Sequence, residues 1–103
     1  MERGFVCMNT ATQEALDILQ EECAEVIVEV SKCRRFGIDS VHYRTGELHR
    51  VMLEQEIGDV LALIDILVDQ GVLDTDALDA AKESKRLKLM QWSRIFDEQG
   101  SLV

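Results

Sequence analysis

Residues 52–69 read MLEQEIGDVLALIDILVD, and this stretch decides the fold. At 100° per residue, most of its apolar side chains fill one broad arc of a helix, and a few extend that arc around one flank. The arc consists of Leu53, Ile57, Val60, Leu61, Ile64, Leu67 and Val68, and the extension consists of Met52, Leu63 and Ile66. A helix this apolar needs partners on two sides. We therefore expect self-association into a dimer or a larger helical assembly.

Two more segments have helical periodicity, one on each side of this stretch. We expect helices over about 11–36, from 45 or 46 to 70, and from 75 to about 96, with a loop over 37–44 between the first two. Thr10 begins a capping box for the first helix, and Asp74 is a good N-cap for the third. Gly37 and Gly71 are natural stops for the first two helices.

The composition agrees with an all-helical chain. The 103 residues include no proline, 6 glycines and 5% aromatic residues, whereas a sandwich or a barrel needs many turn residues. We therefore predict an all-α fold, an antiparallel helical bundle completed by homo-oligomerisation. A single domain is expected to span 1–103, with loose termini at 1–9 and 98–103.

The charge and the cysteines restrict the partners and the compartment. The formal net charge is -9, so nucleic-acid backbones and anionic membranes are poor partners for the surface. No apolar stretch approaches the roughly 20 residues that span a bilayer, so no membrane partner is expected. Cys7, Cys23 and Cys33 contain no C-x-x-C pair, and the last two lie on the apolar side of a helix. Buried free thiols there fit a reducing cytoplasm.

Two pairs of acidic residues break the apolar pattern. Glu56 and Asp59 fall inside the extended apolar arc, while Glu22 and Glu25 border the apolar side of the first helix, where Glu29 continues their stripe. Residues three apart are neighbours on a helix, so each pair can hold one ion. A single E-x-x-E pair is usually a solvated charge run, but two inward-pointing pairs on separate helices favour a metal site. All-oxygen ligands select magnesium or manganese.

The same acids carry a resemblance to a known family. Glu21-Glu22-Cys23-Ala24-Glu25 followed by Glu56-Ile57-Gly58-Asp59 matches the E-E-x-x-E … E-x-x-D signature of the all-α nucleoside triphosphate pyrophosphatases. Over about residues 14–95 the chain resembles the compact MazG-like branch, small versions of which are common in phages. The 30 residues between Glu25 and Glu56 are somewhat more than is usual in that family and place an extended loop between the two helices.

The resemblance implies that the chain hydrolyses (deoxy)nucleoside triphosphates to the monophosphate and pyrophosphate, in the cytoplasm of a cell or, for a viral protein, of its host. Glu22, Glu25, Glu56 and Asp59 would be the magnesium ligands, with manganese as a possible substitute. Glu21 matches the first acid of the motif but points away from the others on an ideal helix, which makes it a supporting acid or a weak general-base candidate. The resemblance also implies a homodimer or a tetramer of two tight dimers.

Cations for the phosphates are expected on the third helix. Lys85 and Lys88 belong to the densest basic cluster of the sequence and share a helical face with Trp92. Such a cluster equally fits the general preference for positive charge near a helix C-terminus. The resemblance, in which a late helix offers basic residues to the phosphates, favours these three residues as substrate-binding.

Base and sugar contacts are expected from Lys32, Arg35 and the loop through His42 and Tyr43. Lys32 and Arg35 equally fit a solvated helix face, on which their aliphatic stems cover apolar surface and their charged ends reach water. Two further polar residues, Glu29 and His49, lie in the segments on either side of this loop. Glu29 would either orient the attacking water or be solvated, and His49 is expected on the helix surface.

Two other functions remain open. One is a non-catalytic acidic helical adaptor that uses its apolar second helix to bind partners. The other is a related pyrophosphohydrolase acting on a different nucleotide, such as phosphoribosyl-ATP. No G-x-x-x-x-G-K-[ST] loop is present, so a P-loop nucleotidase is excluded.

Overall fold

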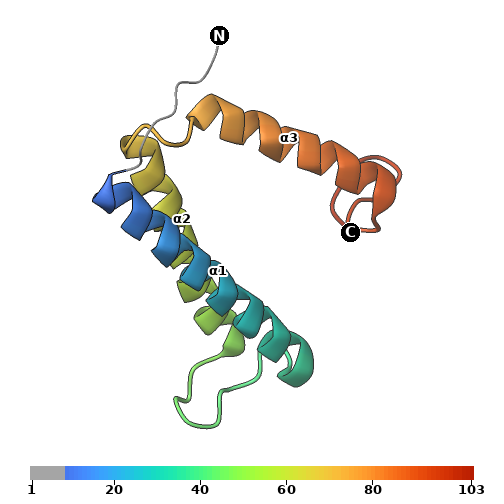
Figure 1. Ribbon diagram of the computed structural model, residues 1–103. Helices are drawn as coiled ribbons and strands as arrows, with labels where there is room; N and C mark the ends of the chain where they lie inside the picture. Colours follow the sequence, from blue (N-terminus) through green and yellow to red (C-terminus); the bar gives the residue numbers. More distant parts are fainter. Residues whose placement is uncertain (1–8) are drawn as a thin grey trace. The chain divides into compact units, whose positions relative to one another are not determined.

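The computed structural model describes residues 9–103 and is built from three helices. These are α1 (Thr10–Phe36), α2 (His49–Asp69) and α3 (Thr75–Trp92), shown in Figure 1. Within residues 9–103 there is no strand, only two isolated bridges, so the all-α prediction is confirmed. Cys7 and most of the expected loose N-terminus lie outside the described residues.

Side chains at the helix starts explain two of the boundaries. The N-cap of α1 is Asn9, whose Oδ1 accepts a hydrogen bond from the Thr12 amide at 2.8 Å, so the expected cap at Thr10 is wrong by one residue. Asn9 is as good a cap as threonine, since either side-chain oxygen can satisfy a free amide of the first turn. The Asp74 carboxylate caps α3 as expected, accepting from the Ala77 amide at 3.0 Å.

The start of α2 differs more from the expectation. The helix begins at His49 rather than at residue 45 or 46, because the preceding residues fold back on themselves. The His42 amide donates to the Glu47 carbonyl at 2.7 Å, and Val41 pairs with Leu48 in an isolated bridge. Gly46 completes this turn with a φ of 73°, a left-handed conformation that favours glycine.

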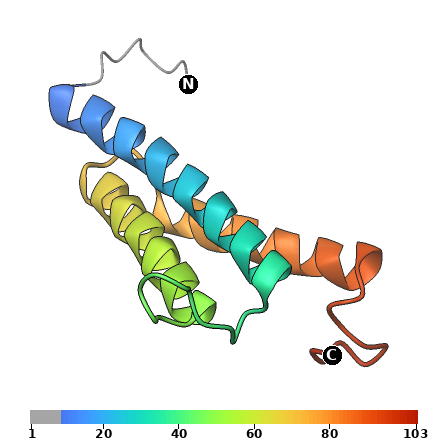
Figure 2. The same ribbon diagram turned by 90° about the horizontal axis from the view of Figure 1, so that it is seen from below.

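The first two helices form an antiparallel hairpin. Thr12 Oγ1 donates to Gln70 Oε1 at 3.4 Å, which joins the start of α1 to the end of α2. At the other end, Cys33 Sγ donates to the His49 carbonyl at 3.6 Å. Figures 1 and 2 show the two helices side by side along most of their length, with the loop closing one end.

The hairpin buries little apolar surface. Among the described hydrophobic residues only Leu67 and Ala15 are buried, and Leu67 alone is fully buried. Large apolar side chains of both helices stay exposed, including Ile27, Val28, Val30, Ile57, Leu61 and Ile66. Cys23 is also exposed and Cys33 is half-buried, so the expectation of two buried thiols is wrong for Cys23. Both are free cysteines, and Cys23 belongs to the exposed apolar side of α1.

The chain divides into two compact units, residues 1–72 with the hairpin and residues 73–103 with α3. In the second unit α3 ends at Trp92, about four residues earlier than expected, and Ser93 caps it with hydrogen bonds to the Leu89 carbonyl. The following residues are tied together: the Asp97 amide donates to Ser101 at 2.7 Å and the Val103 amide to Ile95 at 2.9 Å. These hydrogen bonds form a turn, and the expectation of a loose terminus at 98–103 remains a prediction.

The expectation of a single domain over 1–103 remains a prediction. None of the helices within residues 9–103 combines the length and the hydropathy that crossing a bilayer requires.

Candidate metal centre

The hairpin brings together three of the four predicted metal ligands. One carboxylate oxygen from each of Glu22, Glu56 and Asp59 lies within 4.8 Å of the other two. Glu56 and Asp59 are one turn apart on α2, and Glu22 reaches them from α1. Glu22 and Glu56 are half-buried between the helices, while Asp59 is exposed. The three residues are called the carboxylate cluster below.

The spacing of the carboxylate cluster is close to what one magnesium ion requires. Magnesium binds oxygens at about 2.1 Å, so two oxygens on opposite sides of one ion lie about 4.2 Å apart. The three oxygens all lie within 4.8 Å of one another, so small side-chain rotations at most are needed for them to hold one ion. The donor set consists of carboxylates alone, which suits a hard cation such as Mg²⁺ or Mn²⁺.

The electrostatics of the carboxylate cluster are those of crowded negative charges. Burial raises the pKa of Glu56 above its ordinary value, and the negative charge of Asp59 raises it further. A hydrogen bond with Glu22 and the charges of Glu22 and Glu25 act in the same direction. A carboxyl pair can share a hydrogen bond only if one partner carries a proton. Glu56 therefore retains its proton more readily than an isolated glutamate does, and a cation would replace that proton.

The other two acids of the motif lie at the edge of the carboxylate cluster. Glu25 is exposed and lies outside the group of three, although its charge still raises the pKa of Glu56. Glu21 is exposed as well and is not among the three clustered acids. A direct metal contact by Glu25 and a supporting or general-base role for Glu21 remain predictions.

Glu29 is buried, with only 4% of its surface exposed, so the alternative of a solvated Glu29 is wrong. Its Oε1 accepts a hydrogen bond from Lys32 Nζ at 3.2 Å, whereas its Oε2 is buried with no partner. Burying a carboxylate oxygen without a hydrogen bond is costly. Glu29 lies two turns beyond Glu22 on the same face of α1, and its role in orienting water remains a prediction.

His49 is buried as well, with 3% exposed, which overturns its expected place on the helix surface. Its ring stacks on Phe36 with centroids 5.5 Å apart, and His42 meets it edge-on at 5.8 Å. The Nδ1 atom of His49 has no hydrogen-bond partner. The sequence contains one indication of this burial. His49 precedes Glu56 by seven residues, so both lie on the same face of a helix.

A cavity of about 600 Å³ opens at the loop end of the hairpin. Its lining includes four rings and two cations: Phe36, His42, Tyr43, His49, Lys32 and Arg44. We call this cavity the loop pocket. Sequence reasoning singled out Lys32, His42 and Tyr43, but it missed Phe36, Arg44 and His49, because only the folded loop brings them together.

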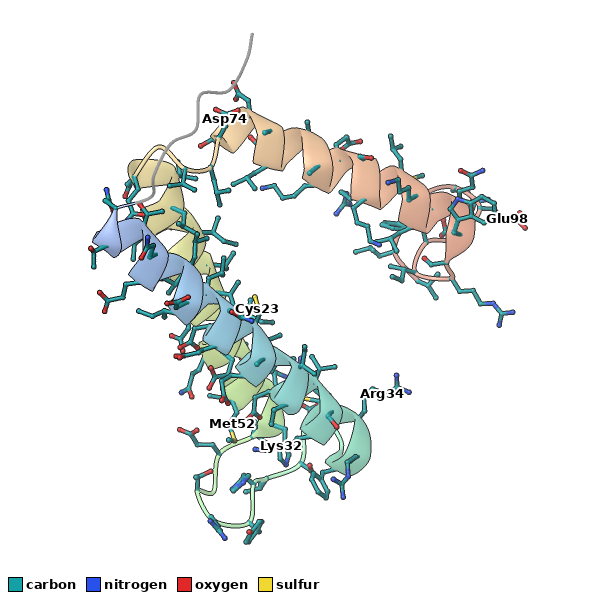
Figure 3. The ribbon with its side chains drawn as sticks, in the orientation of Figure 1. Cys23, Lys32, Arg34, Met52, Asp74 and Glu98 are labelled. Atoms are coloured by element: carbon teal, nitrogen blue, oxygen red, sulfur yellow. The ribbon has the colours of Figure 1, made fainter. Side chains whose placement is uncertain are left out.

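The predicted substrate-binding residues fall into two groups. Lys32 lines the loop pocket, and Figure 3 shows it on the side of α1 that faces the loop, with Arg34 on the other side. Arg35 is exposed and lies over the Phe36 ring at 5.1 Å. Lys85, Lys88 and Trp92 are exposed on α3, in the second unit, and their phosphate contacts remain a prediction.

Comparison of the chain with family models, with curated proteins and with solved structures finds no match. The resemblance to the all-α nucleoside triphosphate pyrophosphatases therefore depends on the acidic motif, and the functional argument depends on the geometry of these residues.

Proposed function

We propose that this protein is a magnesium-dependent pyrophosphohydrolase that converts (deoxy)nucleoside triphosphates to the monophosphate and pyrophosphate. The observation that carries the proposal is the carboxylate cluster, in which oxygens from two separate helices converge within 4.8 Å. In a solvated charge run, like charges repel one another and stay apart. Here the neighbouring acids are close enough to raise the pKa of Glu56. A bound cation removes that repulsion.

Glu22, Glu56 and Asp59 would hold the ion, with Mn²⁺ as a substitute for Mg²⁺, and Glu25 would add a further carboxylate at the edge. When bound, such an ion neutralises the acids and the phosphates and lowers the pKa of a coordinated water. This compensation is essential here, because a triphosphate carries about four negative charges toward a protein whose own net charge is -9.

The reaction itself requires few protein groups beyond the ligands. A water oxygen forms a bond to the α-phosphorus, the bond from that phosphorus to the bridging oxygen breaks and releases pyrophosphate, and the proton of the water passes to the solvent. By holding the ion, Glu22, Glu56 and Asp59 would fix the position of the triphosphate relative to this water. Glu29, with its buried and unpartnered Oε2, would orient the water from a position two turns beyond Glu22 on α1.

We further propose that a second copy of the chain covers the exposed apolar side of the hairpin. A groove of about 250 Å³ there is lined by Cys23, Val26, Ile27, Ile57 and Val60, all of them apolar apart from the thiol. Exposed apolar patches of this kind mark association surfaces. A Leu61→Asp variant should therefore shift the parent from a dimer or tetramer toward the monomer in sedimentation velocity, whereas a parent that sediments as a monomer would contradict the proposal.

The decisive experiment for the activity is a screen of the eight canonical NTPs and dNTPs with Mg²⁺, in which monophosphate and pyrophosphate are quantified separately. The proposal predicts equal amounts of both products from at least one nucleotide, and none from the Glu56→Gln variant. Release of orthophosphate alone would contradict cleavage at the α-phosphorus.

The same screen separates the alternatives. An adaptor releases nothing and binds no metal, so its signature is inactivity together with an unchanged thermal stability in Mg²⁺. A relative that acts on another nucleotide still binds metal, and it would cleave phosphoribosyl-ATP, which is added as a ninth substrate.

A further inference from the structure

The loop pocket is a concave, aromatic and cationic site in a strongly acidic protein. Among the described residues that line it, Lys32 and Arg44 are cations and none is an acid, although the chain carries a net charge of -9. Its volume of about 600 Å³ lies within the usual range of small-molecule sites. This combination suits a ligand that has an aromatic part and a negative charge.

The rings of the pocket are arranged as a continuous set. Phe36 stacks on His49, His49 meets His42 edge-on, and His42 stacks on Tyr43 with centroids 5.1 Å apart. Two of these rings retain free surface, since 55% of Phe36 and 83% of Tyr43 are exposed. Exposed aromatic side chains beside a cavity are the usual platforms on which a nucleobase stacks. The guanidinium groups of Arg35 and Arg44 lie over Phe36 and Tyr43 at 5.1 and 5.4 Å, and a stacked base would displace them.

The polar groups of the pocket supply hydrogen-bonding capacity as well. His42 Nδ1 accepts from the amides of Arg44 and Thr45 at 3.1 and 3.3 Å, which requires the neutral ring to carry its proton on Nε2. That N–H is a donor without a partner among the described residues. Nδ1 of His49, which is nine-tenths buried in the lining, has no partner either.

The pocket is also aligned with the carboxylate cluster. His49 and Glu56 are separated by seven residues of α2, and Lys32 lies seven residues of α1 beyond Glu25, the acid at the edge of the cluster. Seven residues are two helical turns, so each pair shares a face, and the two sites are about 10 Å apart along the hairpin. This distance is comparable to the length of a nucleoside.

We propose that the loop pocket binds the nucleoside part of the substrate, with the base stacked on Phe36 and Tyr43 and hydrogen-bonded by His42. This inference rests on the proposed function for the identity of the triphosphate, which would extend from the pocket to the carboxylate cluster. Lys32, which is hydrogen-bonded to Glu29 between the two sites, would meet the sugar or the α-phosphate.

The test measures binding without metal and without turnover. The eight canonical nucleosides are titrated into the metal-free, ¹⁵N-labelled full chain, with deoxyribose and ribose as ligands that lack a base. At least one nucleoside should bind tenfold more tightly than its sugar and shift the amide signals of residues 36–49. Phe36→Leu and Tyr43→Ser should each weaken this binding at least fivefold, while Glu56→Gln leaves it unchanged.

Ile38→Ser is the matched control, because Ile38 is an exposed apolar residue of the same loop that is not part of the pocket lining. Unchanged amide spectra outside the loop verify that each variant is folded. The inference is overturned if no nucleoside binds better than its sugar, or if Ile38→Ser weakens binding as much as Tyr43→Ser. Base-selective binding without pyrophosphate release would support nucleoside binding in the loop pocket and refute the proposed function. Pyrophosphate release at a KM that Phe36→Leu and Tyr43→Ser do not change would support the proposed function and refute the binding of the nucleoside in the loop pocket.

Discussion

The carboxylate cluster and the loop pocket lie along one hairpin but arise in different ways. In the cluster, Glu56 and Asp59 stand at i and i+3 on α2, so helical geometry brings these two together, and the pairing of α1 with α2 adds Glu22. The pocket depends on a loop whose shape is fixed by tertiary hydrogen bonds, such as the one from the Arg50 amide to the Ile38 carbonyl at 2.8 Å. The comparison teaches that a pair of clustered acids follows from the regular helix that carries it, whereas a pocket built on a loop depends on tertiary contacts.

The largest expected effect concerns turnover at the carboxylate cluster. Glu56→Gln or Asp59→Asn removes a proposed metal ligand at constant volume, so kcat should fall about a thousandfold or more, the scale of losing a group that stabilises transition-state charge. Pyrophosphate release under saturating nucleotide measures this effect. Glu54→Gln is the matched control, since Glu54 is an exposed acid two residues before Glu56. Activity of Glu56→Gln within a few-fold of the parent would show that the cluster is not the reaction site.

The next effect is the stabilisation of the fold by metal. An ion that binds only the folded cluster stabilises it by RT ln(1 + [L]/Kd), about 2.7 kcal/mol at a hundredfold excess over Kd. For a domain of this size the Tm should rise by about 10 °C or more. Millimolar Mg²⁺ should therefore raise the Tm of the parent in a thermal melt, and should do much less for a Glu22→Gln, Glu25→Gln double variant.

This melt needs two controls. NaCl at matched ionic strength also screens the repulsion among surface acids, so it gives the nonspecific part of the shift. A Glu14→Gln, Asp17→Asn double variant makes the same change of charge at exposed positions of α1. Equal shifts in MgCl₂ and matched NaCl would favour the solvated charge run and the adaptor.

A smaller effect is expected at the loop. The Arg50 guanidinium donates two hydrogen bonds to the Asp39 carboxylate, at 2.8 and 2.9 Å, and so braces the segment that forms the pocket. Both side chains are exposed, and such pairs contribute at most about 1 kcal/mol. Arg50→Met should lower the Tm by a few degrees at most and weaken nucleoside binding, while the Mg²⁺-induced rise in Tm stays unchanged. Loss of that rise would show that the two sites are one cooperative unit.

The smallest effect is a dependence of metal-free stability on pH. Because the folded state raises the pKa of Glu56, protonation stabilises the fold; this contribution is full below the unfolded pKa of about 4.3 and is lost as the pH rises through the folded pKa. In metal-free buffer, Glu56→Gln should therefore be more stable than the parent at pH 7.5, and the difference should shrink as the pH falls toward 4. Thermal melts measure the difference, and a constant offset across this range would refute the crowding of charges.

The features predicted from the sequence are those that depend on neighbouring residues along the chain. The three helices, the cap at Asp74 and the placement of Glu56 beside Asp59 on α2 follow from periodicity and local side-chain chemistry. The start of α2 does not, because its N-cap, Leu48, makes no side-chain hydrogen bond and is placed by its bridge to Val41.

The features that the sequence did not predict depend on contacts between distant residues. His49 was expected at the surface because histidine is polar, but stacking on Phe36, thirteen residues earlier, buries it. The exposure of Cys23 has a related cause. A helical wheel identifies the apolar side of α1, but the two-helix hairpin covers only part of that side.

The central claim is that one divalent ion binds between α1 and α2 at the carboxylate cluster, and paramagnetic broadening by Mn²⁺ tests it most directly. Substoichiometric Mn²⁺ is added to the ¹⁵N-labelled parent and to Glu56→Gln at equal ionic strength. The account predicts that amide signals near Glu22, Glu56 and Asp59 broaden first in the parent, and that this selectivity disappears in the variant. Broadening spread evenly over all exposed acids, or a pattern that Glu56→Gln leaves unchanged, would contradict it.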